Sequence, residues 1–178
     1  MNQKNRKTIT LAKLREWRAC GDYDGADKGI DYWKSIGSPA SLKKAIQICI
    51  DSKQTKRLDD ANWLIVRMMN YQNCVLYAAH AAELVLDNFE REFPDDKRPR
   101  LAIEAARAFA KNPTEENKAA ASAASAAEAA AWAAWAARAA RAARAAESAE
   151  SAEESRLDIQ IKCLQYGIKL IYGKAKTK

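Results

Sequence analysis

Apolar side chains recur at intervals of three and four residues along most of the chain, which is the spacing of one helix face. This spacing predicts helices over residues 8–20, 23–35, 39–50, 59–69, 71–93, 99–111 and 157–172, with a polar loop over 51–57. No segment shows the sustained alternation of a strand. We therefore expect an all-α fold, a compact bundle of seven or eight helices joined by short connections.

Residues with strong positional preferences mark the ends of these helices. Ser38-Pro39 predicts an N-cap followed by a first helical residue, and Asp59 or Asp60 is expected to cap the next helix. Pro94 should end the long fifth helix, and Pro99 should open the sixth. On the sixth helix the apolar period places these side chains inward: Leu101, Ala102, Ala105, Ala106 and Phe109.

An alanine-rich tract forms the most unusual part of the chain, since 22 of the 35 residues from Lys118 to Ala152 are alanine. Alanine has the highest helix propensity, so the tract predicts a long helix, capped by Thr114, around which the bundle is built. Its bare surface would let a neighbouring helix approach closely. An unbroken helix to Tyr172 would be about 87 Å long. Because that length does not suit a compact domain, we expect a break between Ser148 and Arg156.

The length and charge of the chain limit its organisation. A chain of 178 residues with a net charge of +7 fits one domain over residues 1–178, with a frayed N-terminus over 1–7 and a basic tail over 174–178. The first 57 residues carry 13 basic and 6 acidic side chains. This excess has two interpretations, a surface that recruits an anionic partner or solvated side chains with no partner.

Cysteine and histidine usage argues against a metal site. Cys20, Cys49, Cys74 and Cys163 are far apart and His80 is the single histidine, which excludes zinc-ribbon and thioredoxin-like patterns. Buried free thiols in a reducing cytosol are the simpler interpretation. The chain has neither a signal-peptide pattern nor an apolar run long enough to cross a membrane, so we expect a soluble, cytoplasmic protein.

The chain lacks the sequence motifs that bind phosphate groups or position a catalytic nucleophile. The chain contains no P-loop, GxGxxG or GxSxG pattern. We therefore expect a protein that is not an enzyme and needs no cofactor. Specific nucleic-acid recognition lacks a motif, and a DNA-binding module would show affinity that falls steeply with salt.

The segment DDKRPR, from Asp95 to Arg100, is the first candidate site. In a structural interpretation, Asp95 or Asp96 caps the following helix and Arg98 or Arg100 pairs with a carboxylate on a neighbouring helix. In a functional interpretation, Asp96, Lys97, Arg98 and Arg100 form a binding site, where the basic groups lie beside a helix N-terminus that favours an anion.

A second candidate site lies in the alanine tract, where large side chains follow at steps of three residues. It comprises Trp132, Trp135, Arg138, Arg141 and Arg144. Tryptophan stacking and guanidinium groups suit a phosphorylated, nucleotide-like ligand, and they equally suit an acidic protein surface. Alternatively, the tryptophans fill the core and the arginines pair with internal carboxylates. The alanine surface also makes a homodimer along this helix plausible.

From Asn73 onward the chain resembles a known family. The residues that carry the resemblance are DDKRPR followed by the helix Ile103-Glu104-Ala105-Ala106-Arg107-Ala108 and the alanine-rich run, with Trp63-Leu64 as a weaker match. They resemble the polymorphic-toxin immunity proteins numbered five, a family that also occurs in phage genomes. The resemblance implies an all-α, non-enzymatic protein that neutralises a toxin or a defence component by binding it. The alternative function is a sponge that sequesters a phosphorylated or nucleotide signal.

Overall fold

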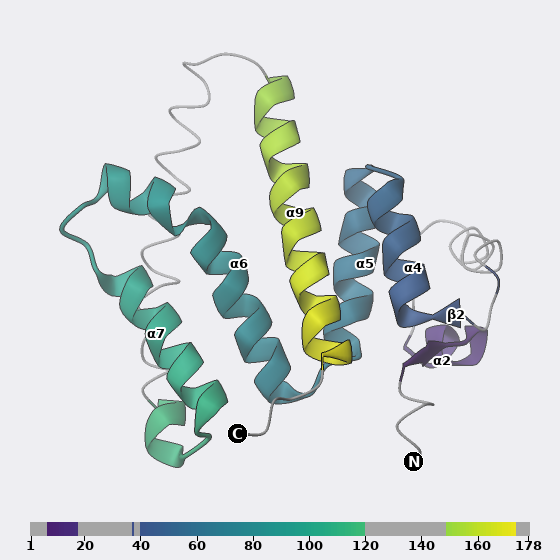
Figure 1. Cartoon of the computed structure of the whole chain (residues 1–178), viewed down its shortest axis with the longest axis horizontal. Coiled ribbons are helices and arrows are strands. Elements are labelled where there is room, and N and C mark those ends of the chain that lie inside the picture. The colour runs from purple at the N-terminus through teal and green to yellow at the C-terminus, as the bar shows by residue number, and fades with distance from the viewer. Residues whose placement is uncertain (1–6, 18–36, 38–39, 120–148, 174–178) are drawn as a thin grey trace. The chain divides into compact units, whose positions relative to one another are not determined.

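A computed structural model describes residues 7–17, 37, 40–119 and 149–173 of the chain (Figure 1). These residues are mostly helical and include one small two-stranded sheet, which confirms the all-α class. The chain forms two compact units, Met1–Met68 and Met69–Lys178. The helix expected over 23–35 and most of the alanine tract lie outside the described residues. The expectation of a single domain over residues 1–178 stays a prediction.

In the first unit a short strand precedes the first helix. Strand β1 (Thr8–Ile9) pairs with β2 (Ala40–Ser41) in an antiparallel arrangement, with Ile9 opposite Ala40. Helix α2 (Leu11–Glu16) follows directly, and the Thr10 hydroxyl accepts the backbone N–H of Lys13 at 3.2 Å. The predicted helix therefore starts after Thr10, because Thr8 and Ile9 are paired in the sheet.

Helix α4 (Leu42–Asp51) begins later than predicted. Its N-cap is Ser41, whose hydroxyl accepts the backbone N–H of Lys44 at 3.2 Å, and not Ser38. The apolar stripe that the sequence predicts is buried, and it comprises Leu42, Ala45, Ile46, Cys49 and Ile50. Strand pairing holds Ala40 and Ser41 extended, so the helix cannot start before them.

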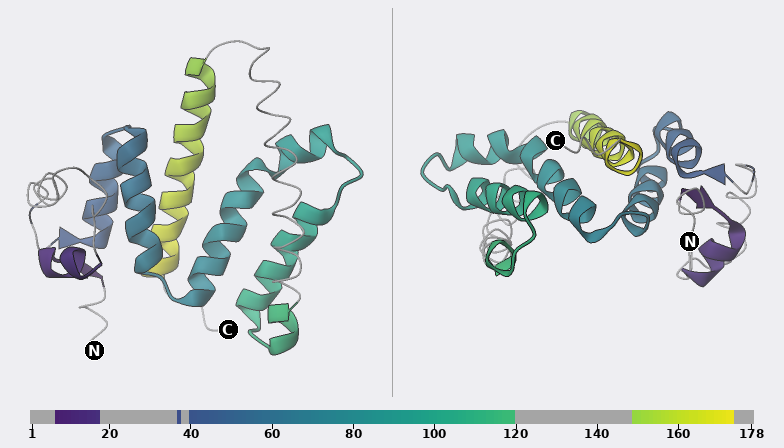
Figure 2. Two further views of the ribbon diagram at one scale, coloured as in Figure 1. Left: turned by 180° about the vertical axis from the view of Figure 1, so that it is seen from behind. Right: turned by 60° about the horizontal axis from the view of Figure 1, so that its bottom comes forward.

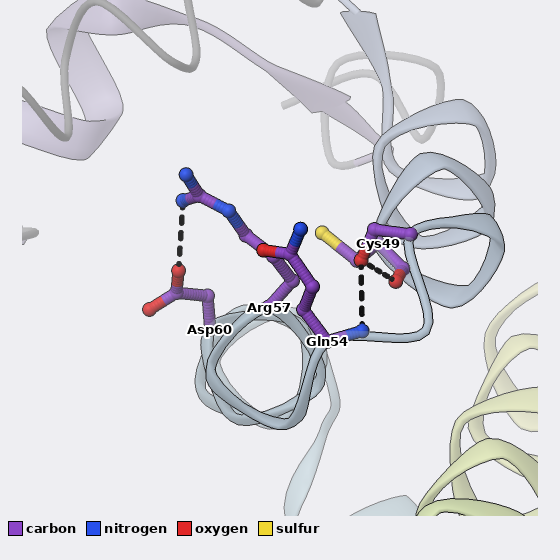
Figure 3. Close-up of polar contacts among 5 residues, drawn as sticks. Cys49, Gln54, Arg57 and Asp60 are labelled. Carbon is purple, nitrogen blue, oxygen red and sulfur yellow. Dashed lines mark hydrogen bonds and ion pairs between the residues drawn. The ribbon is translucent and has the colours of Figure 1, made fainter.

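Helix α5 (Thr55–Arg67) begins earlier than the predicted caps Asp59 and Asp60. Its N-cap, Gln54, makes no side-chain cap bond. Instead, the preceding turn contains Lys53 at φ 51°. The Ser52 hydroxyl donates to the carbonyl of Cys49 at 2.7 Å and accepts the Gln54 N–H at 3.3 Å. Figure 3 labels Cys49 and Gln54, the two residues that these bonds join to Ser52. A turn made by these local bonds, without an acidic cap, is hard to recognise in the sequence.

The second unit contains a helical hairpin and a third long helix. Helix α6 (Tyr71–Glu92) agrees with the predicted range, because the Asn70 side chain accepts the Asn73 N–H at its start and Pro94 follows its end. Helix α6 packs against both α7 (Arg98–Lys111) and α9 (Ala149–Tyr172), and it lies between them in Figure 1 and in the left view of Figure 2. An apolar cluster of Ala79, Leu86 and Ile103 joins α6 to α7.

Two predictions for the second unit are wrong. Leu101 does not face inward, since 57% of its surface is exposed, and Ile103 is buried in its place. No break occurs between Ala149 and Arg156, because α9 is continuous from Ala149 to Tyr172. The predicted cap Thr114 is confirmed, since its hydroxyl accepts the Asn117 N–H at 3.2 Å where a helix begins over residues 115–119.

Candidate functional site

The first candidate site lies at the turn between α6 and α7. Helix α6 ends at Glu92, and the backbone N–H of its C-cap residue, Phe93, still bonds to the carbonyl of Phe89. The Asp96 N–H then donates to the Phe93 carbonyl at 3.1 Å, and the Lys97 Nζ donates to the Pro94 carbonyl at 2.7 Å. These bonds close the turn within a few residues and bring the two helices alongside each other in antiparallel directions.

Asp96 holds Arg98 at the start of α7. Its Oδ1 accepts the Arg98 backbone N–H at 3.1 Å and the Arg98 Nε at 2.9 Å, while Oδ2 accepts Nη2 at 2.6 Å. The side-chain and backbone hydrogen bonds from Arg98 lower the pKa of Asp96 to about 2. Lys97 is the N-cap residue of α7, and its side chain makes no cap bond. Asp96, one residue earlier, accepts the Arg98 N–H and so satisfies one of the free backbone donors at the start of the helix.

Arg100 pairs with Glu90 across the hairpin. The Arg100 Nε donates to Oε1 at 2.7 Å and Nη2 donates to Oε2 at 2.5 Å, which is a two-pronged guanidinium–carboxylate pair. Hydrogen bonding from Arg100 lowers the pKa of Glu90, and the same contact raises the pKa of Arg100. The structural interpretation of this arginine, pairing with a carboxylate on a neighbouring helix, is confirmed.

A third pair lies further along the hairpin and leads toward α9. Arg107 of α7 donates to Glu83 of α6, and Glu83 also lies 3.8 Å from the Nδ1 of His80. The His80 ring packs against Tyr166 of α9 with 4.0 Å between ring centroids. Side chains of α7, α6 and α9 therefore follow one another in contact across the unit.

The turn from Asp95 to Arg100 carries a net charge of +1, but the longer segment that includes the adjoining helix ends is negative on balance. Residues 87–104 contain four basic side chains, Arg91, Lys97, Arg98 and Arg100. They contain six acidic ones, namely Asp87, Glu90, Glu92, Asp95, Asp96 and Glu104. The net charge of this segment is therefore −2, and two of its cations are already paired with carboxylates. Such a surface attracts a cationic partner more readily than an anion.

The predicted site residues have different outcomes. Asp96, Lys97, Arg98 and Arg100 are brought together at the turn. The residues of the second candidate site, Trp132, Trp135, Arg138, Arg141 and Arg144, lie outside the described residues. They stay predictions, as does the homodimer along the alanine tract.

Two residues that sequence reasoning did not assign to the site belong to this surface. Glu90 is the partner of Arg100, and Leu101 is exposed beside it. A signal for Glu90 was present: in an antiparallel hairpin, positions equally distant from the turn face each other, and 90 and 100 lie five residues either side of Asp95. The same rule pairs Glu83 with Arg107, twelve residues either side.

The ranges that the structure describes were searched for metal-binding clusters and for membrane-spanning helices. No group of three or more histidine, cysteine, aspartate or glutamate side chains there could hold a metal ion. None of the helices in those ranges is long and apolar enough to cross a membrane.

Fold and site together define a small all-α protein that presents a charge-paired helical hairpin to solvent. Over residues 65–177 the chain matches the family described as "Imm-5 like putative immunity protein", and it belongs to that family. The match covers nearly all of the second unit and starts after Trp63-Leu64, so it does not include that weaker part of the resemblance. No curated protein and no solved structure matches the chain.

Proposed function

We propose that this chain is an immunity protein that neutralises a toxin by binding it, without catalysis. The observation that carries the proposal is the family match over residues 65–177, which includes α6, α7 and α9. We further propose that it acts in the cytosol. As a phage counter-defence factor, this chain would direct the same binding activity against a host defence component.

The described surface supports binding as the mechanism. Arg98 and Arg100 are held by carboxylates on a solvent-facing turn, and Leu101 is exposed next to them. Arginine is enriched among the residues that dominate binding energy at protein interfaces. Side chains that are already ordered lose less conformational entropy when a partner binds.

A titration distinguishes binding from catalysis. The protein products of the genes adjacent to that of this chain are screened for toxicity. The toxic product, the adjacent-gene toxin, is then assayed for its activity while the purified chain is added in increasing amounts. A binding inhibitor abolishes toxin activity near one molar equivalent, and the released toxin regains activity and has an unchanged mass. Neutralisation by far less than one equivalent, or a covalently altered toxin, would contradict the proposal.

The sponge alternative depends on Trp132, Trp135 and the three arginines of the alanine tract, which the structure does not describe. Calorimetry of the purified chain with cyclic and linear nucleotides tests it directly. The net negative charge around Arg98 and Arg100 does not favour a phosphorylated ligand at the turn, so the protein target is the proposal we retain.

A further inference from the structure

We propose that the toxin docks on the N-terminal half of α7, with Leu101 as the apolar anchor, and that the docking face of the toxin is basic. This inference rests on the proposed function, because it names the surface and the partner chemistry of the same binding activity. It is carried by the exposure of Leu101, the fixed arginines beside it and the charge of the surrounding turn.

Leu101 is exposed without an evident role in folding. Its neighbours on the helix surface, three residues away in either direction, are Arg98 and Glu104, both exposed. Its exposed fraction is 57%, whereas Tyr71, the other large apolar residue exposed among the described residues of this unit, packs edge-on against Phe109. An exposed apolar side chain on one face of a helix can act as the anchor that enters an apolar groove of a partner.

Arg98 and Arg100, which both precede this leucine on α7, are each paired with a carboxylate although about half of each side chain is exposed. Arg98 and Arg100 each use Nε and Nη2 to bind a carboxylate, out of five guanidinium N–H donors. Each therefore keeps about three N–H donors for another acceptor. Because their charges are already compensated, neutral acceptors such as main-chain carbonyl groups of the toxin suit them.

The remaining carboxylates select the charge of the partner. The Arg100 guanidinium pairs with Glu90, which raises the pKa of Arg100, and the negative charges of Glu104 and Asp87 raise it further. Glu92 and Asp95 add further negative charge beside the turn, where both side chains are exposed. A toxin surface with lysine or arginine side chains around its pocket would meet this excess, which speeds association more than it strengthens the final complex.

Purified variants of the full chain test the docking surface against an inactivated form of the adjacent-gene toxin. Leu101→Asp should weaken the complex roughly 30-fold, the size of a central hot-spot loss. Glu104→Lys and Asp95→Lys should each slow association on the order of tenfold at low salt, with a smaller effect at high salt. Val66→Asp changes an exposed apolar residue of the first unit and should leave affinity within about threefold.

The outcomes separate this inference from the proposed function. If the wild-type chain fails to bind or neutralise the toxin, the proposed function fails. If the wild type binds and Leu101→Asp binds equally well, only the docking surface is wrong. Unchanged or faster association of both lysine variants would overturn the basic partner. A dimer of the chain that Leu101→Asp dissociates, with toxin affinity unchanged, would assign this face to self-association and overturn the inference.

Discussion

Two identical substitutions at leucines of the same unit should have very different effects on stability. Leu164 of α9 is buried with 1% of its surface exposed, whereas Leu101 of α7 is 57% exposed. Replacing a buried leucine by alanine removes three carbon atoms and leaves a cavity, which destabilises a protein by about 2–5 kcal/mol. We expect Leu164→Ala to fall in that range, because Leu164 is buried on α9 and this helix packs against α6.

The expected effect of Leu101→Ala is much smaller. Full burial of a leucine side chain stabilises by about 1.5–3 kcal/mol, so a side chain with a little under half of its surface covered contributes roughly 0.6–1.3 kcal/mol. The higher helix propensity of alanine offsets a few tenths of that figure, roughly 0.2 kcal/mol. No cavity forms at an exposed position. We therefore predict a loss below about 1 kcal/mol for Leu101→Ala.

Chemical unfolding followed by circular dichroism measures both losses, and hydrogen exchange of peptides from α6 and α9 assigns them to the second unit. Leu164→Ala should raise exchange throughout these helices, while Leu101→Ala should leave it unchanged. The reasoning is refuted if the two variants lose equal stability, since Leu101 would then belong to the core. It is also refuted if Leu164→Ala loses less than about 1 kcal/mol.

Three other properties follow from individual contacts. Pairing with Arg98 lowers the pKa of Asp96 in the folded chain, so this pair stabilises the fold above the ordinary carboxyl pKa of 3.8. The stabilisation is lost as the pH falls toward 2. In a carboxyl NMR titration, Arg98→Ala should move the pKa of Asp96 back toward 3.8. Asn70→Ala should destabilise α6 by about 1 kcal/mol in urea unfolding, whereas Asn70→Asp keeps a capping oxygen and should be nearly neutral. The buried thiols of Cys49 and Cys163 should resist a maleimide reagent in the native chain and react on unfolding, as mass mapping would show; burial raises the pKa of Cys163 and reinforces its protection.

The boundaries of α6 were predictable because their signals are local. Asn70 supplies the cap bond at one end, and Pro94 cannot continue a helix at the other. The start of α5 was not predictable in the same way. Its preceding turn depends on the positive φ of Lys53 and on two bonds of the Ser52 hydroxyl, and these residues carry no strong positional preference for that role.

Burial depends on what lies next to each helix, which the period of one helix does not reveal. Tyr77, Ala79, Leu86 and Phe89 are all buried on α6, because α6 packs against both α7 and α9. On α7 the buried side is centred on Ala102 and Ile103, so Leu101 is turned out of the core. The predicted apolar face of α7 was slightly rotated from the observed one, and Leu101 was therefore assigned to the core although it lies on the surface.

The ion pairs of the hairpin show why a basic motif in a sequence is weak evidence for an anion site. Read alone, Lys97, Arg98 and Arg100 make a cationic cluster at a helix N-terminus. The fold brings Glu90, ten residues earlier in the chain, against Arg100, and Asp96 forms an ion pair with Arg98. These two carboxylates largely cancel the positive potential of the cluster. What remains is geometry: guanidinium groups fixed in place beside an exposed leucine. Fixed donors and an apolar anchor recognise a shaped surface, which favours a protein as the partner of this turn.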